Sequence, residues 1–120
     1  MNWQFSNSAP IYAQLVGQIR AGIVSGAFSP GERLPSVRDL AMEAGVNPNT
    51  VQRALAELEG TGLLHTQRTA GRFVTEDLSV IQSAKEKLAR GRTREYLSSM
   101  AQLGYSRQQV KALLDTWEEE

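Results

Sequence analysis

The chain of 120 residues has no cysteine, a single histidine and no long run of apolar residues. The absence of cysteine excludes disulfides, thiolate metal sites and thiol-based sensing. His65 stands alone, without metal-ligand spacing or a serine accompanied by a base, so we expect no enzyme, no metal and no cofactor. No stretch of about 20 apolar residues is present to span a membrane, and no secretory signal follows Met1, so we expect a cytoplasmic protein.

The chain also lacks net charge, because thirteen basic residues balance thirteen acidic ones. A nonspecific binder of polyanions is normally basic, so any affinity for nucleic acid must come from a local patch. Up to Thr75 there are six arginines, no lysine and five acidic residues. Arginine suits directional contacts with phosphate and guanine better than lysine does, which favours such a patch in this part of the chain.

Two short capped helices are predicted between residues 36 and 61. Ser36 precedes Asp39 by three positions, an acidic variant of the capping box, so a helix should begin at the next residue after Ser36. Gly45 is placed to end this helix in a left-handed conformation. Asn47 then caps a second helix, with Pro48 at its first position. The separation of about three residues is that of a helix-turn-helix.

The second helix separates an apolar stripe from a polar one. Val51, Ala54, Leu55 and Leu58 recur at helical spacing and are expected to be buried. On another face, asparagine and glutamine can pair with adenine, and arginine with guanine, in the major groove. A solvated polar face is the alternative interpretation, and the caps and the segment that follows favour DNA contact. The outward stripe consists of Asn49, Gln52, Arg53 and Ala56.

A β-hairpin is predicted over residues 63–75, because two strand-forming runs flank a turn that contains Gly71. This hairpin would be the wing of a winged helix. Arg68 and Arg72 lie on either side of the turn, where they could reach phosphates or the edge of the minor groove. Two arginines on a solvated hairpin tip are the alternative, and the neighbouring helix-turn-helix favours DNA contact.

Over residues 8–76 the chain resembles the winged-helix domain of GntR-type bacterial transcription regulators. The similarity lies in the Pro-Ile-Tyr opening, the Pro-Gly-Glu-Arg-Leu-Pro-Ser turn, the Asn-Pro-Asn-Thr-Val start of the recognition helix and the Gly-Leu-Leu exit. Many members have arginine at positions 48 and 52, and their wing commonly reads Arg-Gly-Lys-Gly-Thr. The resemblance implies binding to a double-stranded DNA operator, for which we expect the contacts to come from Arg33, Ser36, Arg38, Asn47, Asn49, Thr50, Gln52, Arg53, Arg68, Thr69, Gly71 and Arg72.

Only 44 residues follow Glu76, too few for a large effector domain. In this the chain resembles the short YtrA-like branch of these regulators, which implies control of transporter genes. We therefore expect a mainly α fold with a small β-hairpin: a winged helix-turn-helix DNA-binding domain over residues 1–76 and a two-helix dimerisation region over residues 77–120.

The C-terminal region is predicted to form a long amphipathic helix ending at Gly104 and a second helix capped by Ser106 with Gln109. The winged domain should close its own core with Ile11, Leu15, Ile19 and Ile23. The C-terminal helices then lack an internal partner, and such a face is usually an interface. We expect a homodimer whose interface contains Leu78, Ile81, Leu88, Leu97, Met100, Leu103, Val110, Leu113, Leu114 and Trp117.

These features predict a dimeric repressor of a pseudo-palindromic operator, with no role at a membrane. The alternative is a winged-helix module that binds protein, but its outward stripe would be expected to carry aromatic residues or leucine. A small-molecule effector remains open: Tyr96, Tyr105 and Trp117 could line a pocket between subunits or form plain core. Trp3 and Phe5 are expected to cover either the winged-domain core or the partner chain.

Overall fold

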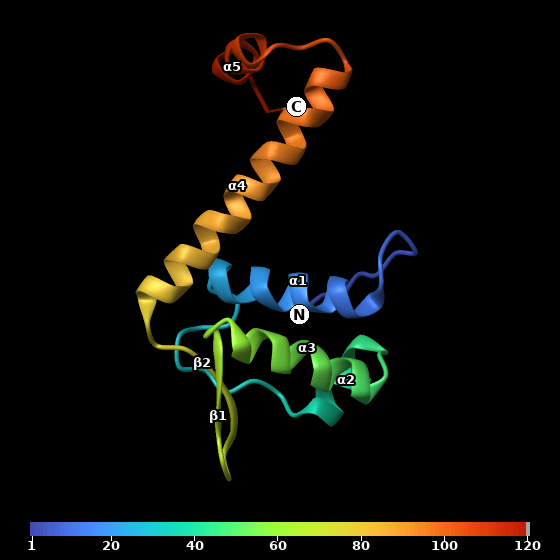
Figure 1. Ribbon diagram of the computed structural model, residues 1–120, viewed down its shortest axis with the longest axis vertical. Coiled ribbons are helices and arrows are strands. Elements are labelled where there is room, and N and C mark those ends of the chain that lie inside the picture. Colours follow the sequence, from blue (N-terminus) through green and yellow to red (C-terminus); the bar gives the residue numbers. More distant parts are fainter. Residues whose placement is uncertain (120) are drawn as a thin grey trace. The chain divides into compact units, whose positions relative to one another are not determined.

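The computed structural model describes residues 1–119 and is mainly helical (Figure 1). Its contacts divide the chain into two compact units, one over residues 1–85 and one beginning at Glu86, and each is described by itself. A winged helix-turn-helix followed by two further helices confirms the expected fold class. In chain order the elements are α1 (Ile11–Ser25), α2 (Val37–Ala44), α3 (Pro48–Gly60), β1 (Leu64–Gln67), β2 (Gly71–Val74), α4 (Leu78–Gln102) and α5 (Arg107–Asp115).

The caps of α2 and α3 lie where the sequence predicts them. The Ser36 hydroxyl accepts from the backbone N–H of Asp39 at 3.1 Å, and Gly45 ends α2 with φ 67°. Asn47 caps α3 by accepting from the backbone N–H of Asn49 at 2.8 Å. The predicted return bond from Asp39 to the Ser36 amide is not among the hydrogen bonds of residues 1–119. Aspartate is one methylene shorter than the glutamate of a full capping box.

The core of the first unit lies around α3, which packs against α1, α2 and β1. Burial of the apolar stripe of α3 confirms that prediction, and three of the four expected α1 residues are buried as well. Ile11 is the exception: it is the first residue of α1 and its side chain is 38% exposed. The buried cluster consists of Leu15, Val16, Ile19, Ile23, Leu34, Leu40, Ala41, Val51, Ala54, Leu55, Leu58, Leu63, Leu64 and Val74.

A third backbone segment pairs with the wing. Besides β1, strand β2 contacts residues 31–34: the Gly31 N–H donates to the Val74 carbonyl at 3.0 Å, and the Leu34 N–H donates to the Arg72 carbonyl at 2.9 Å. Between them the Val74 N–H donates to the carbonyl of Glu32 at 2.9 Å. Sequence reasoning missed this pairing, because a Pro-Gly-rich segment shows no alternation of apolar and polar residues.

The wing turn spans residues 68–70 and does not contain Gly71, although the sequence indicates that it should. The Ala70 N–H donates to the Gln67 carbonyl at 3.0 Å, so the turn is closed before Gly71. Gly71 is the first residue of β2, paired with Gln67, and has φ 105°. A side chain there would be strained, and its Cβ would lie 3.1 Å from Nε of Arg33. Glycine therefore lets Arg33 pass across the base of the turn.

The N-terminal arm, residues 1–6, is tied to α1 by two glutamine side chains. The Gln18 amide accepts from the Gln4 N–H at 3.1 Å and donates to the Gln4 carbonyl at 2.5 Å. The Gln14 amide does the same for Ser6, at 2.9 Å in both directions. Because glutamines four residues apart lie on one helix face, they replace the partner strand that an extended arm lacks.

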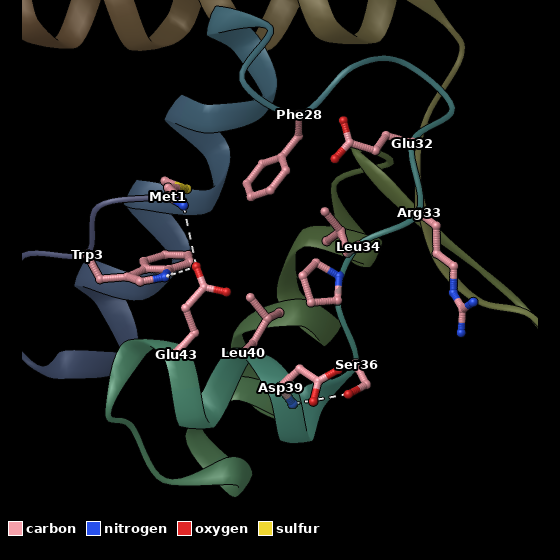
Figure 2. A pocket seen from close by; sticks show the side chains of 11 residues that line it. Met1, Trp3, Phe28, Glu32, Arg33, Leu34, Ser36, Asp39, Leu40 and Glu43 are labelled. Carbon is pink, nitrogen blue, oxygen red and sulfur yellow. Dashed lines mark hydrogen bonds and ion pairs between the residues drawn. The ribbon is translucent and has the colours of Figure 1, made fainter.

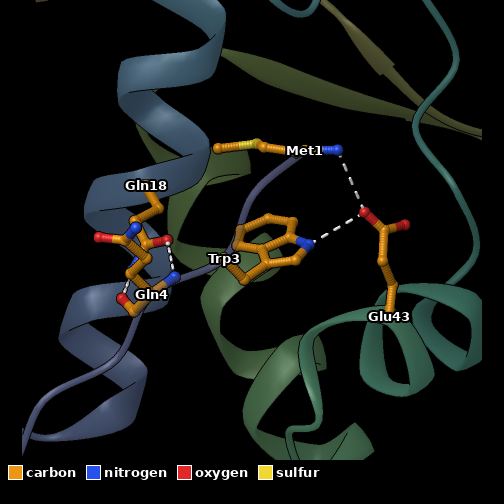
Figure 3. A network of polar contacts seen from close by, with 5 residues as sticks. All are labelled: Met1, Trp3, Gln4, Gln18 and Glu43. Atoms are coloured by element: carbon orange, nitrogen blue, oxygen red, sulfur yellow. Dashed lines mark hydrogen bonds and ion pairs between the residues drawn. The ribbon is translucent and has the colours of Figure 1, made fainter.

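The beginning of the arm reaches α2 (Figure 3). The Trp3 indole N–H donates to the Glu43 carboxylate at 3.0 Å, and the terminal amino group of Met1 lies 3.4 Å from the same oxygen. Trp3 and Phe5 also pack against the buried cluster. Of the two positions that the sequence allowed for these aromatic residues, the winged-domain core is the one occupied.

The first turns of α4 belong to the first unit. Val80, Ile81 and Ala84 pack against the core of the winged domain, which places the division of contacts inside α4. Thus Ile81, which the sequence assigned to a dimer interface, has a partner within its own chain. Leu78, at the start of α4, is 66% exposed.

In the second unit α4 continues to Gln102, and α5 follows after a short turn. The predicted end of this helix is Gly104; α4 ends two residues earlier, and Gly104 takes a left-handed φ of 93° in the turn that follows. The capping box of α5 is complete: the Ser106 hydroxyl accepts from the Gln109 N–H at 3.2 Å and the Gln109 side chain accepts from the Ser106 N–H at 2.8 Å. Across residues 1–119, no helix combines the length and apolar character needed to cross a membrane.

Candidate DNA-binding surface

The exposed face of α3 carries the polar stripe that the sequence predicts. Asn49 and Gln52 are exposed and lie three residues apart, so both project from the same side of the helix. Thr50 is half-buried. Amide groups offer a donor and an acceptor each, which is the chemistry needed to distinguish base edges in a major groove.

Arg53 is held beside α1 by an aromatic ring. Its guanidinium carbon lies 4.0 Å from the centroid of the Tyr12 ring, a cation–π contact between α3 and α1. The Tyr12 hydroxyl donates to the Glu57 carboxylate at 2.6 Å. This hydrogen bond, with a smaller contribution from desolvation, raises the pKa of Tyr12. The Tyr12 ring therefore engages the Arg53 guanidinium with α1.

The wing is fastened to the recognition helix by a network of polar side chains. Arg72 of β2 donates through Nε to the Glu59 carboxylate of α3, and the Thr66 hydroxyl of β1 donates to the same oxygen at 2.6 Å. The hydrogen bonds from Thr66 and Arg72 lower the pKa of Glu59. A further nitrogen of Arg72, Nη1, donates to Oε1 of Gln52 at 3.3 Å.

The tip of the wing points away from this network. Arg68 and Thr69 occupy the turn and are exposed, and within residues 1–119 Arg68 has neither a hydrogen bond nor an ion pair. His65 and Phe73 face each other across the strands, with stacked rings whose centroids lie 6.0 Å apart. The two arginines of the hairpin thus differ: Arg68 is available at the tip, whereas Arg72 is engaged inside the chain.

The remaining predicted contact residues surround α2. Ser36 and Asn47 are exposed, and each uses its side-chain oxygen to cap a helix. Arg38 in the first turn of α2 and Arg33 beside Gly71 are exposed as well. The helix-turn-helix therefore places side chains from α2, from the start of α3 and from the wing at the surface of the first unit.

A pocket of about 480 Å³ lies between the N-terminal arm, α2 and the segment before α2 (Figure 2). Trp3, Phe28 and Leu40 form part of its wall. Two of its carboxylates are already bonded within the chain: Glu43 to the arm, and Glu32 to the Ser29 N–H at 2.8 Å. The hollow is therefore a consequence of how the arm packs on α2.

The second unit leaves most of its apolar side chains at the surface. Val110 is 2% exposed, whereas Leu103, Leu114 and Trp117 are 72%, 57% and 59% exposed. Tyr96 and Tyr105, each 40% exposed, do not line the shallow hollow of about 560 Å³ found on α4. The other predicted interface residues, Leu88, Leu97, Met100 and Leu113, are half-buried.

Sequence reasoning missed Tyr12 and Glu59, because both act through partners far along the chain. Tyr12 belongs to the Pro-Ile-Tyr opening, whose sequence alone indicates no contact for it. Glu59 lies seven residues after Gln52 and so on the same side of α3, two turns further on. That spacing, next to a hairpin rich in arginine, is the signal that could have indicated an ion pair with the wing.

Comparisons with known proteins cover both units. A sequence model described as "Bacterial regulatory proteins, gntR family" matches residues 11–74. The chain is 36% identical over 119 residues to the uncharacterized HTH-type transcriptional regulator YhcF of Bacillus subtilis strain 168, covering 99% of this chain and 98% of YhcF. It is 37% identical over 97 residues to the HTH-type transcriptional repressor YtrA of the same strain, covering 81% of this chain and 70% of YtrA.

Solved structures give the same picture. A GntR family transcriptional regulator from Listeria monocytogenes superposes with a TM-score of 0.86 at 39% identity, over 95% of this chain and all of that one. AraR(DBD), solved in complex with operator ORX1, superposes with a TM-score of 0.57 at 28% identity, over 62% of this chain and 96% of that one.

Proposed function

On the premise that the chain belongs to the gntR family of bacterial regulatory proteins, we propose that it is a homodimeric repressor. Within that family it is a short, YtrA-like DNA-binding transcription regulator and not an enzyme. Two copies bind one pseudo-palindromic operator. Each copy places α3 in the major groove and its wing tip against the adjacent backbone.

The observation that carries the readout is the exposed pair Asn49 and Gln52 on α3. Both side chains can form directional hydrogen bonds with base edges, whereas a protein-binding face would be expected to carry aromatic residues or leucine. Arg38 and Arg68, which flank this pair on α2 and at the wing tip, supply charge for phosphates. The superposition on AraR(DBD), a DNA-binding domain solved with its operator, supports the same use of the fold.

The proposed dimer is supported by the apolar surface of the second unit. A unit that begins at Glu86 is too short to close a core alone, and among its described residues only Val110 is buried. Leu103, Leu114 and Trp117 would be covered by the same residues of a second copy, as a two-fold interface requires. An unrelated protein could also cover this surface, but it would not provide a second recognition helix for the same operator.

Two-fold pairing has a consequence for the DNA. Two copies of α3 related by a two-fold axis read the same base sequence on opposite strands, so the half-sites should be inverted and about one helical turn apart. Occupation of such a site at a promoter would block transcription. The relative YtrA is named a transcriptional repressor, which supports this direction of control. We also propose that the genes controlled by this chain encode transporters.

Selection of bound sequences from random duplex DNA at physiological salt tests this proposal with the full chain. We expect enrichment of an inverted repeat, and two chains per duplex in the stoichiometry of the winning complex. No enrichment would contradict the proposal and favour a winged-helix module that binds protein. Enrichment of a single half-site bound by one chain would reject the dimer alone.

The enriched operator then tests repression. Placed between a promoter and a reporter gene in a bacterial host, it should lower reporter expression when the chain is present, and Asn49→Ala should relieve this effect. Unchanged or raised expression would contradict the repressor role. Occurrence of the operator before transporter genes in the genome that encodes the chain would support those targets, and its absence there would reject them.

A further inference from the structure

We propose that Arg72 and Glu59 fix the side-chain amide of Gln52 as a hydrogen-bond donor, so that the operator carries guanine rather than adenine opposite Gln52. This inference rests on the proposed function, in which the exposed face of α3 reads bases. It assigns Arg72 a positioning role, in contrast to the DNA contact that the sequence predicted for this residue.

Arg72 is held from two sides, and its position is therefore defined. Its side chain is 18% exposed and its Nε donates to Glu59, whose side chain is 30% exposed. The Glu59 oxygen also accepts from the Thr66 hydroxyl at 2.6 Å, which ties the acceptor to β1 as well. The Arg72 carbonyl accepts from the Leu34 N–H at 2.9 Å, so its backbone is fixed too. Charge-assisted hydrogen bonds of this kind are stronger than those between neutral groups.

The second contact of Arg72 determines which way the Gln52 amide faces. Nη1 of Arg72 donates to Oε1 of Gln52 at 3.3 Å. A guanidinium group has only donors, so it is the oxygen of the amide, and not the nitrogen, that must face Arg72. Nε2 of Gln52 has no hydrogen bond to any residue of 1–119, and Gln52 is exposed. The group that Gln52 offers to DNA is therefore its NH₂ donor.

A glutamine whose NH₂ donor is held outward selects a different base than a glutamine whose amide can rotate. Glutamine reads adenine by accepting from N6 and donating to N7 at the same time, which needs both ends of the amide. The bond from Arg72 occupies one of the two lone pairs of Oε1 and holds this oxygen toward the wing, so the NH₂ donor is the end of the amide that is free to reach a base. Guanine presents two adjacent acceptors, N7 and O6, whereas adenine presents one acceptor beside the N6 donor, which would face the NH₂ group unfavourably. Guanine is thus the base that the arrangement favours.

The test compares selections from random duplex DNA by the unmodified chain and four variants. The position whose preference disappears in Gln52→Ala is the one that faces Gln52, and in the unmodified chain it should be guanine. Competition binding with single-base-pair variants should then show guanine favoured over adenine by about tenfold, within the range of one good base contact. In Arg72→Met this ratio should fall to about twofold or reverse, because the amide can rotate to pair with adenine.

Two further variants separate this role from others. Arg72→Lys keeps a charge for Glu59 but has no second nitrogen to hold Gln52, so it should change the base preference in the same way. Arg33→Met removes an exposed arginine that does not contact Gln52; it should weaken binding to all sequences and leave the guanine preference intact. Thermal unfolding of each variant verifies that it is folded.

The outcomes are distinct. Adenine at the Gln52 position in the unmodified chain would overturn the inference, and so would a guanine preference that survives in folded Arg72→Met and Arg72→Lys. An equal loss of affinity for all sequences in these two variants, with base preference unchanged, would instead assign Arg72 to a phosphate. Failure of the unmodified chain to enrich any sequence would reject the proposed function itself, which is a different result.

Discussion

The guanidinium of Arg53 on α3 is stacked on the ring of Tyr12 on α1, with 4.0 Å between the guanidinium carbon and the ring centroid. The recognition helix is thereby held on the α1 side by Arg53 and on the wing side by Glu59, which pairs with Arg72. Around the circumference of the helix, Asn49 and Gln52 lie between Arg53 and Glu59, and both are exposed. Fixed side chains around a reading face reduce the conformational freedom lost when DNA binds.

Arg53→Ala should weaken binding to all duplexes alike. The guanidinium over the Tyr12 ring keeps its N–H edge free for a phosphate, and the ring contact restrains Arg53 from following a base edge. Titrations with operator and with random duplex at several salt concentrations should show equal losses and a salt slope smaller by about 1. If Arg53→Ala relaxed one base position and left random DNA unaffected, Arg53 would be a base reader.

Tyr12→Phe should change how stability depends on pH. Because the hydrogen bond to Glu57 raises the pKa of Tyr12, the stabilisation is present below the pKa of an unfolded tyrosine and is lost as pH rises through the folded value. The unfolding temperature of the unmodified chain should therefore exceed that of Tyr12→Phe up to about pH 10, and the difference should shrink above it. Tyr105→Phe, which removes a hydroxyl that has no hydrogen bond within residues 1–119, is the control. A difference independent of pH would contradict the assignment.

Asn47 combines a cap with a position at the proposed DNA surface, and two substitutions separate these roles. Asn47→Ala removes the acceptor for the Asn49 N–H and should lower the free energy of unfolding by about 1 kcal/mol. Asn47→Asp keeps a capping oxygen and should retain stability, but its charge should weaken DNA binding. Urea unfolding and operator titration measure the two effects. Normal affinity in Asn47→Asp would place Asn47 away from the DNA.

Leu114→Asp should dissociate the proposed dimer. The side chain is 57% exposed in the single chain, and each dimer would bury it twice, so sedimentation equilibrium should show a dissociation constant raised by tenfold or more, which corresponds to about 1.4 kcal/mol or more. Met42→Asp, at a 74% exposed apolar residue of α2, is the matched control and should leave the association unchanged. Equal behaviour of the two variants would reject this interface.

Local features were predictable from the sequence, because neighbouring residues decide them. The cap at Ser106, the end of α2 at Gly45 and the start of α3 at Asn47 each depend on residues within three or four positions. The buried stripe of α3 follows from helical spacing in the same way. These signals were sufficient for the fold class and for the outward position of Asn49 and Gln52.

Contacts between distant segments were not predictable in this way. The bond from Tyr12 to Glu57 joins residues 45 positions apart, and that from Arg72 to Glu59 joins residues 13 apart. The residue type of Arg72 and its position in the hairpin predict a DNA contact. Its engagement by Glu59 depends on the angle between the wing and α3, which only the packed core determines.

Affinity for the selected operator, compared with a shuffled duplex of equal length and composition at physiological salt, tests the central claim most directly. If α3 reads bases through Asn49 and Gln52, the operator should bind at least about a thousandfold more tightly than the shuffled duplex. The double variant Asn49→Ala with Gln52→Ala should lose most of that ratio while keeping its affinity for shuffled DNA. Equal affinity of the unmodified chain for both duplexes would contradict the account.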